Sequence, residues 1–189
     1  FCILFTSKFS AQLTNEQIKT IISSGDESQL LKENSRLLFE GFYFQADMVM
    51  EKLLGFQPEN SNYNYRKGYL VIRVQQNFAG AISYLEKFST SSKITQARAY
   101  KLLGDAYADS GKNDQALEYY KKAAAHFEED EVNSPEYLFM AAYFADQVLK
   151  NTSEATSLYE QIRKKYPRSQ QSFDAEKNLA RLGVYTSND

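Results

Sequence analysis

The stretch "LLGDAYADSGKNDQALEYYKKAA", residues 102–124, decides how this chain folds. Two segments of helical periodicity lie on either side of "SGKND". Small residues, Gly104, Ala116 and Ala123, stand where a neighbouring helix would come close, and the large Tyr120 lies among them. The spacing predicts two helices packed against each other as a hairpin. Few of its side chains are of kinds that carry out chemistry, so the pattern indicates a surface built by repetition.

The same spacing recurs along the chain. An alanine opens the second helix of each unit, and the intervals between these alanines are 35, 35 and 39 residues. A large residue follows each alanine four positions later, and the middle of the first helix precedes it by twelve or thirteen. The alanines are Ala46, Ala81, Ala116 and Ala155; the large residues are Met50, Leu85, Tyr120 and Tyr159; the first-helix positions are Asn34, Gly68, Gly104 and Tyr143. A repeat of this length predicts stacked helix hairpins.

This pattern resembles the tetratricopeptide repeat (TPR), a helix–turn–helix unit of about 34 residues with Leu-Gly, Tyr, Ala, an aromatic residue, Ala and Pro at fixed positions. The repeat at about 97–130 matches best and lacks only the final Pro, which is replaced by Glu128. The other repeats are expected at about 27–60, 61–95 and 136–169. Asn34 and Tyr143 replace the Gly in the first and fourth repeats, and Tyr143 is expected to hold its two helices slightly further apart.

The flanks of the array fit the same architecture. Residues 12–26 are expected to form an N-terminal capping helix, because "TNEQ" at 14–17 has the spacing of a capping box. The array would occupy 27–183, with 170–183 as a C-terminal capping helix and 184–189 as a tail or linker. The predicted fold class is therefore all-α: a right-handed superhelical solenoid of about four hairpins with a capping helix at each end.

Composition narrows the classes of function. Lys and Arg number 22 against 24 Asp and Glu, for a net charge of −2, so no basic field exists to hold nucleic acid. The apolar content of 43% is too high for a disordered chain. No apolar run approaches the ~20 residues that span a membrane. The single cysteine, Cys2, excludes an intramolecular disulfide and a thiolate metal cluster.

The first eleven residues, "FCILFTSKFSA", are more apolar than the "TNEQ" segment that follows. We interpret residues 1–11 as the remnant of a secretory signal peptide cut after Ala11, with Gln12 as the first mature residue. The alternatives are a buried N-terminal segment and a segment of non-native origin.

The sequence contains few groups that could carry out chemistry. It has no Gly-rich phosphate loop and no His-Glu-x-x-His or Gly-x-Ser-x-Gly motif. His126 is the only histidine and is interpreted as a half-exposed residue at a helix end. Asp105 and Asp109 lie one turn apart and could in principle act as an acid–base pair, but a charged, solvated strip is the simpler interpretation. We therefore predict no enzyme activity, no cofactor and no metal.

A binding surface is the stronger prediction. In the TPR family, ligands lie along the concave face formed by the first helices of successive repeats, and the resemblance places eight residues there. They are Tyr65, Tyr69 and Arg73 from the second repeat, Arg98, Lys101 and Asp105 from the third, and Tyr137 and Phe144 from the fourth. Tyr, Phe and Arg are common at binding hot spots, although aromatic residues at helical spacing are often core. Asp105 stands where a carboxylate-gripping family member has an amide, so that mode of binding is not predicted.

A narrower resemblance concerns residues 37–70, "LLFEGFYFQADMVMEKLLGFQPENSNYNYRKGYL". This run resembles the N-terminal repeats of exported bacterial envelope proteins, including peptidoglycan-anchored proteins of the OmpA family. It implies a periplasmic or outer-membrane-associated scaffold that binds a protein or peptide, as part of a longer protein or alone. Two alternatives stay open: a structural spacer or homo-oligomerisation module of a larger complex, and, without a signal peptide, a cytoplasmic adaptor.

Overall fold

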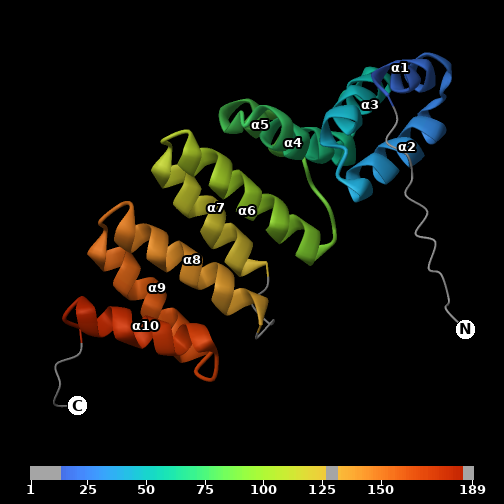
Figure 1. Ribbon diagram of the computed structural model, residues 1–189. Coiled ribbons are helices and arrows are strands. Elements are labelled where there is room, and N and C mark those ends of the chain that lie inside the picture. The colour runs from blue at the N-terminus through green and yellow to red at the C-terminus, as the bar shows by residue number, and fades with distance from the viewer. Residues whose placement is uncertain (1–13, 127–131, 185–189) are drawn as a thin grey trace, which may run out of the picture.

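The computed structural model describes residues 14–126 and 132–184, and within these ranges every regular element is a helix. The helices are α1 (Asn15–Ser24), α2 (Glu27–Glu40), α3 (Tyr43–Phe56), α4 (Ser61–Gln75), α5 (Phe78–Leu85), α6 (Lys93–Asp109), α7 (Asn113–Ala125), α8 (Asn133–Gln147), α9 (Thr152–Lys165) and α10 (Gln170–Arg181). They follow one another in space in chain order (Figure 1). Residues 1–11, interpreted above as a signal peptide, and most of the tail lie outside the described residues.

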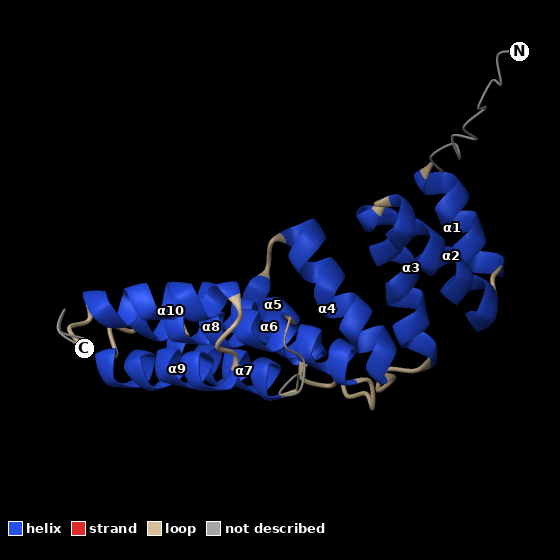
Figure 2. Ribbon diagram, turned by 90° about the horizontal axis from the view of Figure 1, so that it is seen from below, coloured by secondary structure: helices blue, strands red, loops and turns tan. Residues whose placement is uncertain are grey.

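Four helix hairpins make up the body of the molecule, as the repeat predicts: α2–α3, α4–α5, α6–α7 and α8–α9. In Figure 2, α8 and α10 lie in one layer and α7 and α9 in a second, so in this part of the array the first helix α8 lies on the side opposite the second helices α7 and α9. The chain is therefore an all-α solenoid. At its start, Thr14 accepts a hydrogen bond from the Gln17 amide and the Gln17 side chain accepts one in return, which forms the capping box that "TNEQ" predicts.

Each hairpin turn contains one residue in the left-handed conformation. These residues are Gly41, Gln76, Gly111 and Lys150, with φ of 81°, 52°, 73° and 54°. Each stands five positions before the alanine that marks its repeat, so the backbone repeats with the same intervals as the sequence. The left-handed residue ends the first helix and lets the chain reverse; at Gly111 the following amide, from Lys112, donates to the Tyr107 carbonyl at 2.9 Å.

Two glycines allow close approach within a hairpin. A Cβ atom on Gly68 would lie 2.6 Å from Cγ of Leu85, and one on Gly104 would lie 2.5 Å from the Tyr120 ring. Real Cβ contacts are essentially never that short. The sequence prediction that small residues set the spacing between paired helices is confirmed at these two positions.

The first and fourth hairpins depart from this arrangement. Asn34 is fully buried, and its Nδ2 donates to the Ala46 carbonyl of α3 at 2.9 Å. The Tyr143 ring lies at the surface, 52% exposed, and Ala142 and Ala145 are buried in α8 instead. The expectation that Tyr143 would separate its helices is wrong in this respect, because the side chain turns to solvent and is not wedged between them.

Two groups of buried apolar side chains form the core. One joins α1 to the first part of the array and includes Ile18, Leu37 and Leu53; the other runs from Val71 of α4 to Leu179 of α10. Helix α4 contributes to both, so it connects the two halves. The second helix of its hairpin, α5, is short and ends at Leu85, and the apolar residue that follows at 88 is buried beyond the helix end.

The close contact at Gly104 predicts a stability effect. Gly104→Ala should lower the free energy of unfolding by about 1 kcal/mol, because overpacking against Tyr120 costs ~1–3 kcal/mol and alanine returns ~1 kcal/mol of helix propensity. The matched control is Gly55→Ala on α3, where a Cβ atom would meet nothing within 4 Å; it should stabilise the protein by ~0.5–1 kcal/mol. Urea denaturation followed by circular dichroism measures both. Equal effects of the two substitutions would contradict this account of Gly104.

Candidate functional site

The candidate site lies on the surface formed by α2, α4, α6 and α8, called here the first-helix face. All eight residues predicted to contact a partner belong to α4, α6 or α8. Arg73 and Arg98 are exposed, and the other six are partly buried. The structure divides them into three groups, described in turn.

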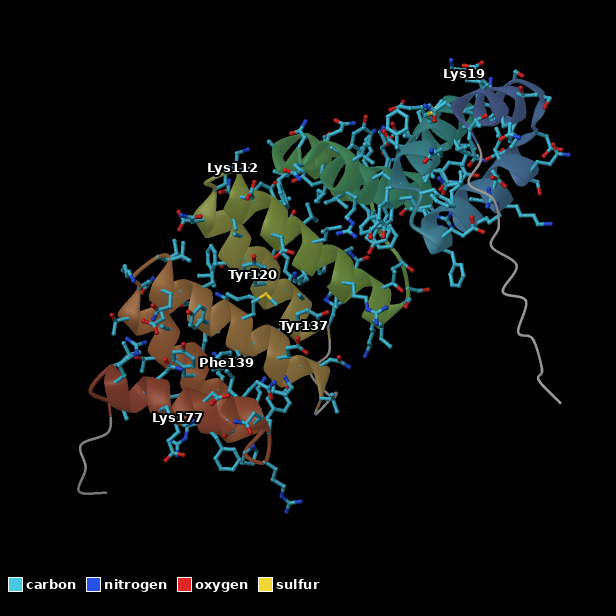
Figure 3. The ribbon with its side chains drawn as sticks, in the orientation of Figure 1. Lys19, Lys112, Tyr120, Tyr137, Phe139 and Lys177 are labelled. Carbon is cyan, nitrogen blue, oxygen red and sulfur yellow. The ribbon has the colours of Figure 1, made fainter. Side chains whose placement is uncertain are left out.

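The first group brings three adjacent hairpins together. The Tyr65 ring lies 4.6 Å from that of Phe88, and the Arg98 charge acts on both Tyr65 and Tyr137. Burial raises the pKa of both tyrosines, and Arg98 lowers it by a smaller amount. Tyr137 is labelled on α8 in Figure 3. Arg98 of α6 therefore lies near tyrosines of α4 and α8.

The second group has a structural role. Lys101 donates to the Asp105 carboxylate at 2.5 Å, and the Tyr120 hydroxyl donates to the same carboxylate at 3.0 Å. The Phe144 ring packs edge-on against Tyr120 at 5.3 Å. Asp105 thus joins α6 to α7, while Asp109 is exposed at the end of α6. This arrangement favours the interpretation of these acids as a paired surface strip over an acid–base pair.

The third group lies at the C-terminal end of α4. The Arg73 guanidinium lies 4.8 Å from the Tyr43 ring centre and 5.8 Å from that of Tyr69, within the range of cation–π attraction. It also donates to the Tyr43 hydroxyl at 3.4 Å, and this hydrogen bond lowers the pKa of Tyr43. Tyr43 and Tyr69 meet edge to face at 6.0 Å. Arg73 is held across two aromatic rings from different hairpins.

An open groove of 400 Å³ lies between α2 and α4. Its lining consists of Ser35, Leu38, Tyr65, Arg66 and Tyr69. Only the two tyrosines were expected from the sequence. The other three were missed because the repeat pattern gives no indication of which residues of α2 face α4; the polar Asn34 at a glycine position was the available signal.

A second hollow of 520 Å³ lies on the opposite side, between α7 and α9 over the start of α8. Three lysines and two glutamates line it, and Lys121 donates to Glu154 at 2.9 Å across it. At its base the hydroxyls of Ser134 and Tyr166 are 2.7 Å apart.

The described residues also bear on metal binding, membrane spanning and the position of His126. Residues 14–126 and 132–184 contain no group of three or more His, Cys, Asp or Glu placed to hold a metal ion. Among these residues, no helix has both the length and the apolar character needed to cross a membrane. His126 caps the C-terminal end of α7, with its ring edge-on to Tyr100 at 5.0 Å, so it is the partly exposed helix-end residue that the sequence predicted.

Comparison with known proteins supports the repeat. The sequence model of the tetratricopeptide repeat family matches residues 136–169, which is the predicted fourth repeat. No curated protein sequence matches the chain. Several solved structures are similar in fold, and all three described next are below 25% sequence identity.

MamA from Desulfovibrio magneticus RS-1 superposes with a TM-score of 0.60 at 24% identity, covering 82% of this chain and 88% of that one. YrrB, described as a TPR protein with an unusual peptide-binding site, gives 0.61 at 17% identity over 86% and 84%. PilW, described as a widely conserved type IV pilus biogenesis factor, gives 0.55 at 16% identity over 91% and 86%. The fold of this chain is therefore that of a TPR solenoid.

The tyrosines predict how stability depends on pH. Burial, aided by a hydrogen bond to Glu27, raises the pKa of Tyr63 from 10.0 to about 12. Between these values the unfolded chain loses a proton that the folded chain keeps, so stability is full below about pH 10 and is lost as pH rises above it. The pKa is raised in the same direction at Tyr65, Tyr69, Tyr107, Tyr119, Tyr120, Tyr137 and Tyr159.

We therefore expect the midpoint of urea denaturation to fall steeply from about pH 10 to about pH 12. Tyr63→Phe should make this fall shallower, because it removes one of the contributing groups. A midpoint that does not change over this range would show that these hydroxyls are not buried as described.

Proposed function

We propose that this protein is a non-catalytic scaffold of the bacterial cell envelope that binds a segment of a protein partner along its first-helix face. The observation that carries the proposal is the α2–α4 groove, which lies on that face and is lined by Tyr65, Tyr69 and Arg66. Aromatic residues and arginine dominate the energetics of protein recognition, and a repeat array offers a long surface on which to place them. YrrB, similar in fold, is described as having a peptide-binding site.

The envelope is proposed on narrower grounds. Residues 37–70 resemble the repeats of exported envelope proteins, and residues 1–11 have the composition of a signal-peptide remnant. PilW, a pilus biogenesis factor, shares the fold. A cytoplasmic adaptor is the alternative if residues 1–11 are not a signal peptide.

A second candidate function is a structural spacer or homo-oligomerisation module that uses the opposite side of the array. The α7–α9 hollow favours it, because this is the larger hollow of the two and it lies on the second helices. Lys121 pairs with Glu154 across this hollow, so part of its charge is already neutralised within the chain.

Site-specific photo-crosslinking in the native host tests which side binds. A probe at Tyr69 should give a defined adduct with another protein, a probe at Glu118 in the α7–α9 hollow should give none, and a probe at Lys177 on α10 serves as a control for non-specific capture. Adducts from Glu118 alone, or a dimer of this chain, would favour the spacer function instead.

Intact-mass analysis of the protein from its native host tests export. The expected mature N-terminus is Gln12, because the proposed cleavage follows Ala11. The control is the same measurement after secretion is blocked, which should leave residues 1–11 attached. A chain that retains these residues under both conditions would favour the cytoplasmic adaptor.

A further inference from the structure

Two neighbouring cations on α4 have opposite surroundings. Lys67 points toward α3, where its Nζ donates to Asp47 at 2.7 Å and also to Glu51. Its side chain is only 2% exposed. Burial lowers the pKa of Lys67, but the two carboxylates more than offset that effect and the pKa is raised. The charge of Lys67 is thus matched within the fold.

Arg66 points toward α2 and has no such match. Its Nη1 donates to Asn34 Oδ1 and to Ser35 Oγ, each at 2.9 Å, and both acceptors are neutral. In the part of the chain that the structure describes, no carboxylate pairs with Arg66, and its Nε and Nη2 have no acceptor. Burial lowers the pKa of Arg66, as expected for a cation that loses water without gaining an anion.

The direction of the Arg66 guanidinium is fixed by Asn34, which is itself held by a hydrogen bond to α3. Asn34 is fully buried, and because its Nδ2 donates to the Ala46 carbonyl, its Oδ1 is turned toward Arg66. Three helices, α2, α3 and α4, therefore hold one guanidinium group in place. A planar donor group oriented in this way suits two-point recognition of a carboxylate.

The groove around Arg66 combines this cation with apolar walls. Leu38, Tyr65 and Tyr69 line it, and 400 Å³ is space for a few side-chain groups, not for a folded domain. Arg73 lies beyond Tyr69, and Arg98 lies near Tyr65. Neither of these arginines forms an ion pair with a described residue, so the positive charge extends along the face on both sides of the groove.

We infer that the α2–α4 groove binds an internal Asp or Glu side chain of an extended partner segment, with Arg66 as the anchor and a neighbouring apolar residue of the segment against Leu38, Tyr65 and Tyr69. This inference rests on the proposed function and names the chemistry of the partner. An internal acidic residue fits better than a terminal carboxylate, because Arg73 and Arg98 lie on the two sides of Arg66. A segment that continues past Arg66 in both directions can approach both of these arginines, whereas a segment that ends at Arg66 can approach only one.

The test begins with selection of peptides on the immobilised full chain. One displayed library presents random segments internally, and a second presents them with a free C-terminus. The internal library should yield peptides in which Asp or Glu adjoins an apolar residue, and their affinity should fall as salt is raised.

A double-mutant cycle then assigns the carboxylate to Arg66. Arg66→Gln should weaken a selected peptide about tenfold or more, and replacing the acidic residue of the peptide by its amide should weaken it by a similar factor. The two changes together should weaken it no further than either alone. Arg66→Lys should lose less than Arg66→Gln, and Arg168→Gln, an exposed arginine between α9 and α10, should bind as the original protein does. Thermal melting verifies that each variant is folded.

The outcomes separate this inference from the proposed function. Peptides without acidic residues, or peptides selected only with a free C-terminus, would overturn the inference while leaving a binding groove. Additive losses in the cycle would also overturn it, because they would place the carboxylate elsewhere. No peptide from either library, together with no adduct from the Tyr69 crosslinking probe, would remove the proposed function itself.

Discussion

The structure depends on how closely the two helices of each hairpin approach one another. At Gly68 and Gly104 the side chain of the second helix occupies the space where a Cβ atom would stand. The left-handed turn and the alanine recur in step, with the alanine five residues after the left-handed residue in all four hairpins, whereas the small residue of the first helix recurs as glycine in only two of them. Each hairpin packs mainly on its neighbours. A departure from the repeat pattern in one hairpin therefore changes the packing of that hairpin and its neighbours only, and the array tolerates it.

The first hairpin uses such a departure. Asn34 takes the glycine position, and its buried amide has to be satisfied by hydrogen bonds. The Ala46 carbonyl accepts from one end of that amide, and the other end accepts from Arg66 in the next hairpin. The residue that breaks the repeat therefore connects three helices, and it fixes a cation at the surface of the groove. A glycine at position 34 would allow the hairpin but would leave Ser35 as the one acceptor that orients that guanidinium among the described residues.

The sequence was sufficient for the helices, the order of the hairpins and the role of the small residues, since these follow from spacing alone. It failed where the direction of a side chain mattered. Tyr143 was expected between helices and lies at the surface, and α5 ends at Leu85 although the apolar pattern continues beyond it. The groove was found only in part. Tyr65 and Arg66 are adjacent in sequence, and only the position of α2 beside the groove shows that both belong to its lining.

The contrast between Arg66 and Lys67 shows why the two cations are not interchangeable. A lysine taken out of water loses its proton readily, so a buried one needs carboxylates close by, and Asp47 and Glu51 supply them inside the fold. An arginine keeps its charge with neutral partners, and Asn34 and Ser35 are enough to orient it. The chain therefore has lysine where the charge is neutralised from within and arginine where it stays available to an anion from outside. That difference in chemistry, on two consecutive residues of one helix, separates the side of α4 that packs on α3 from the side that lines the α2–α4 groove.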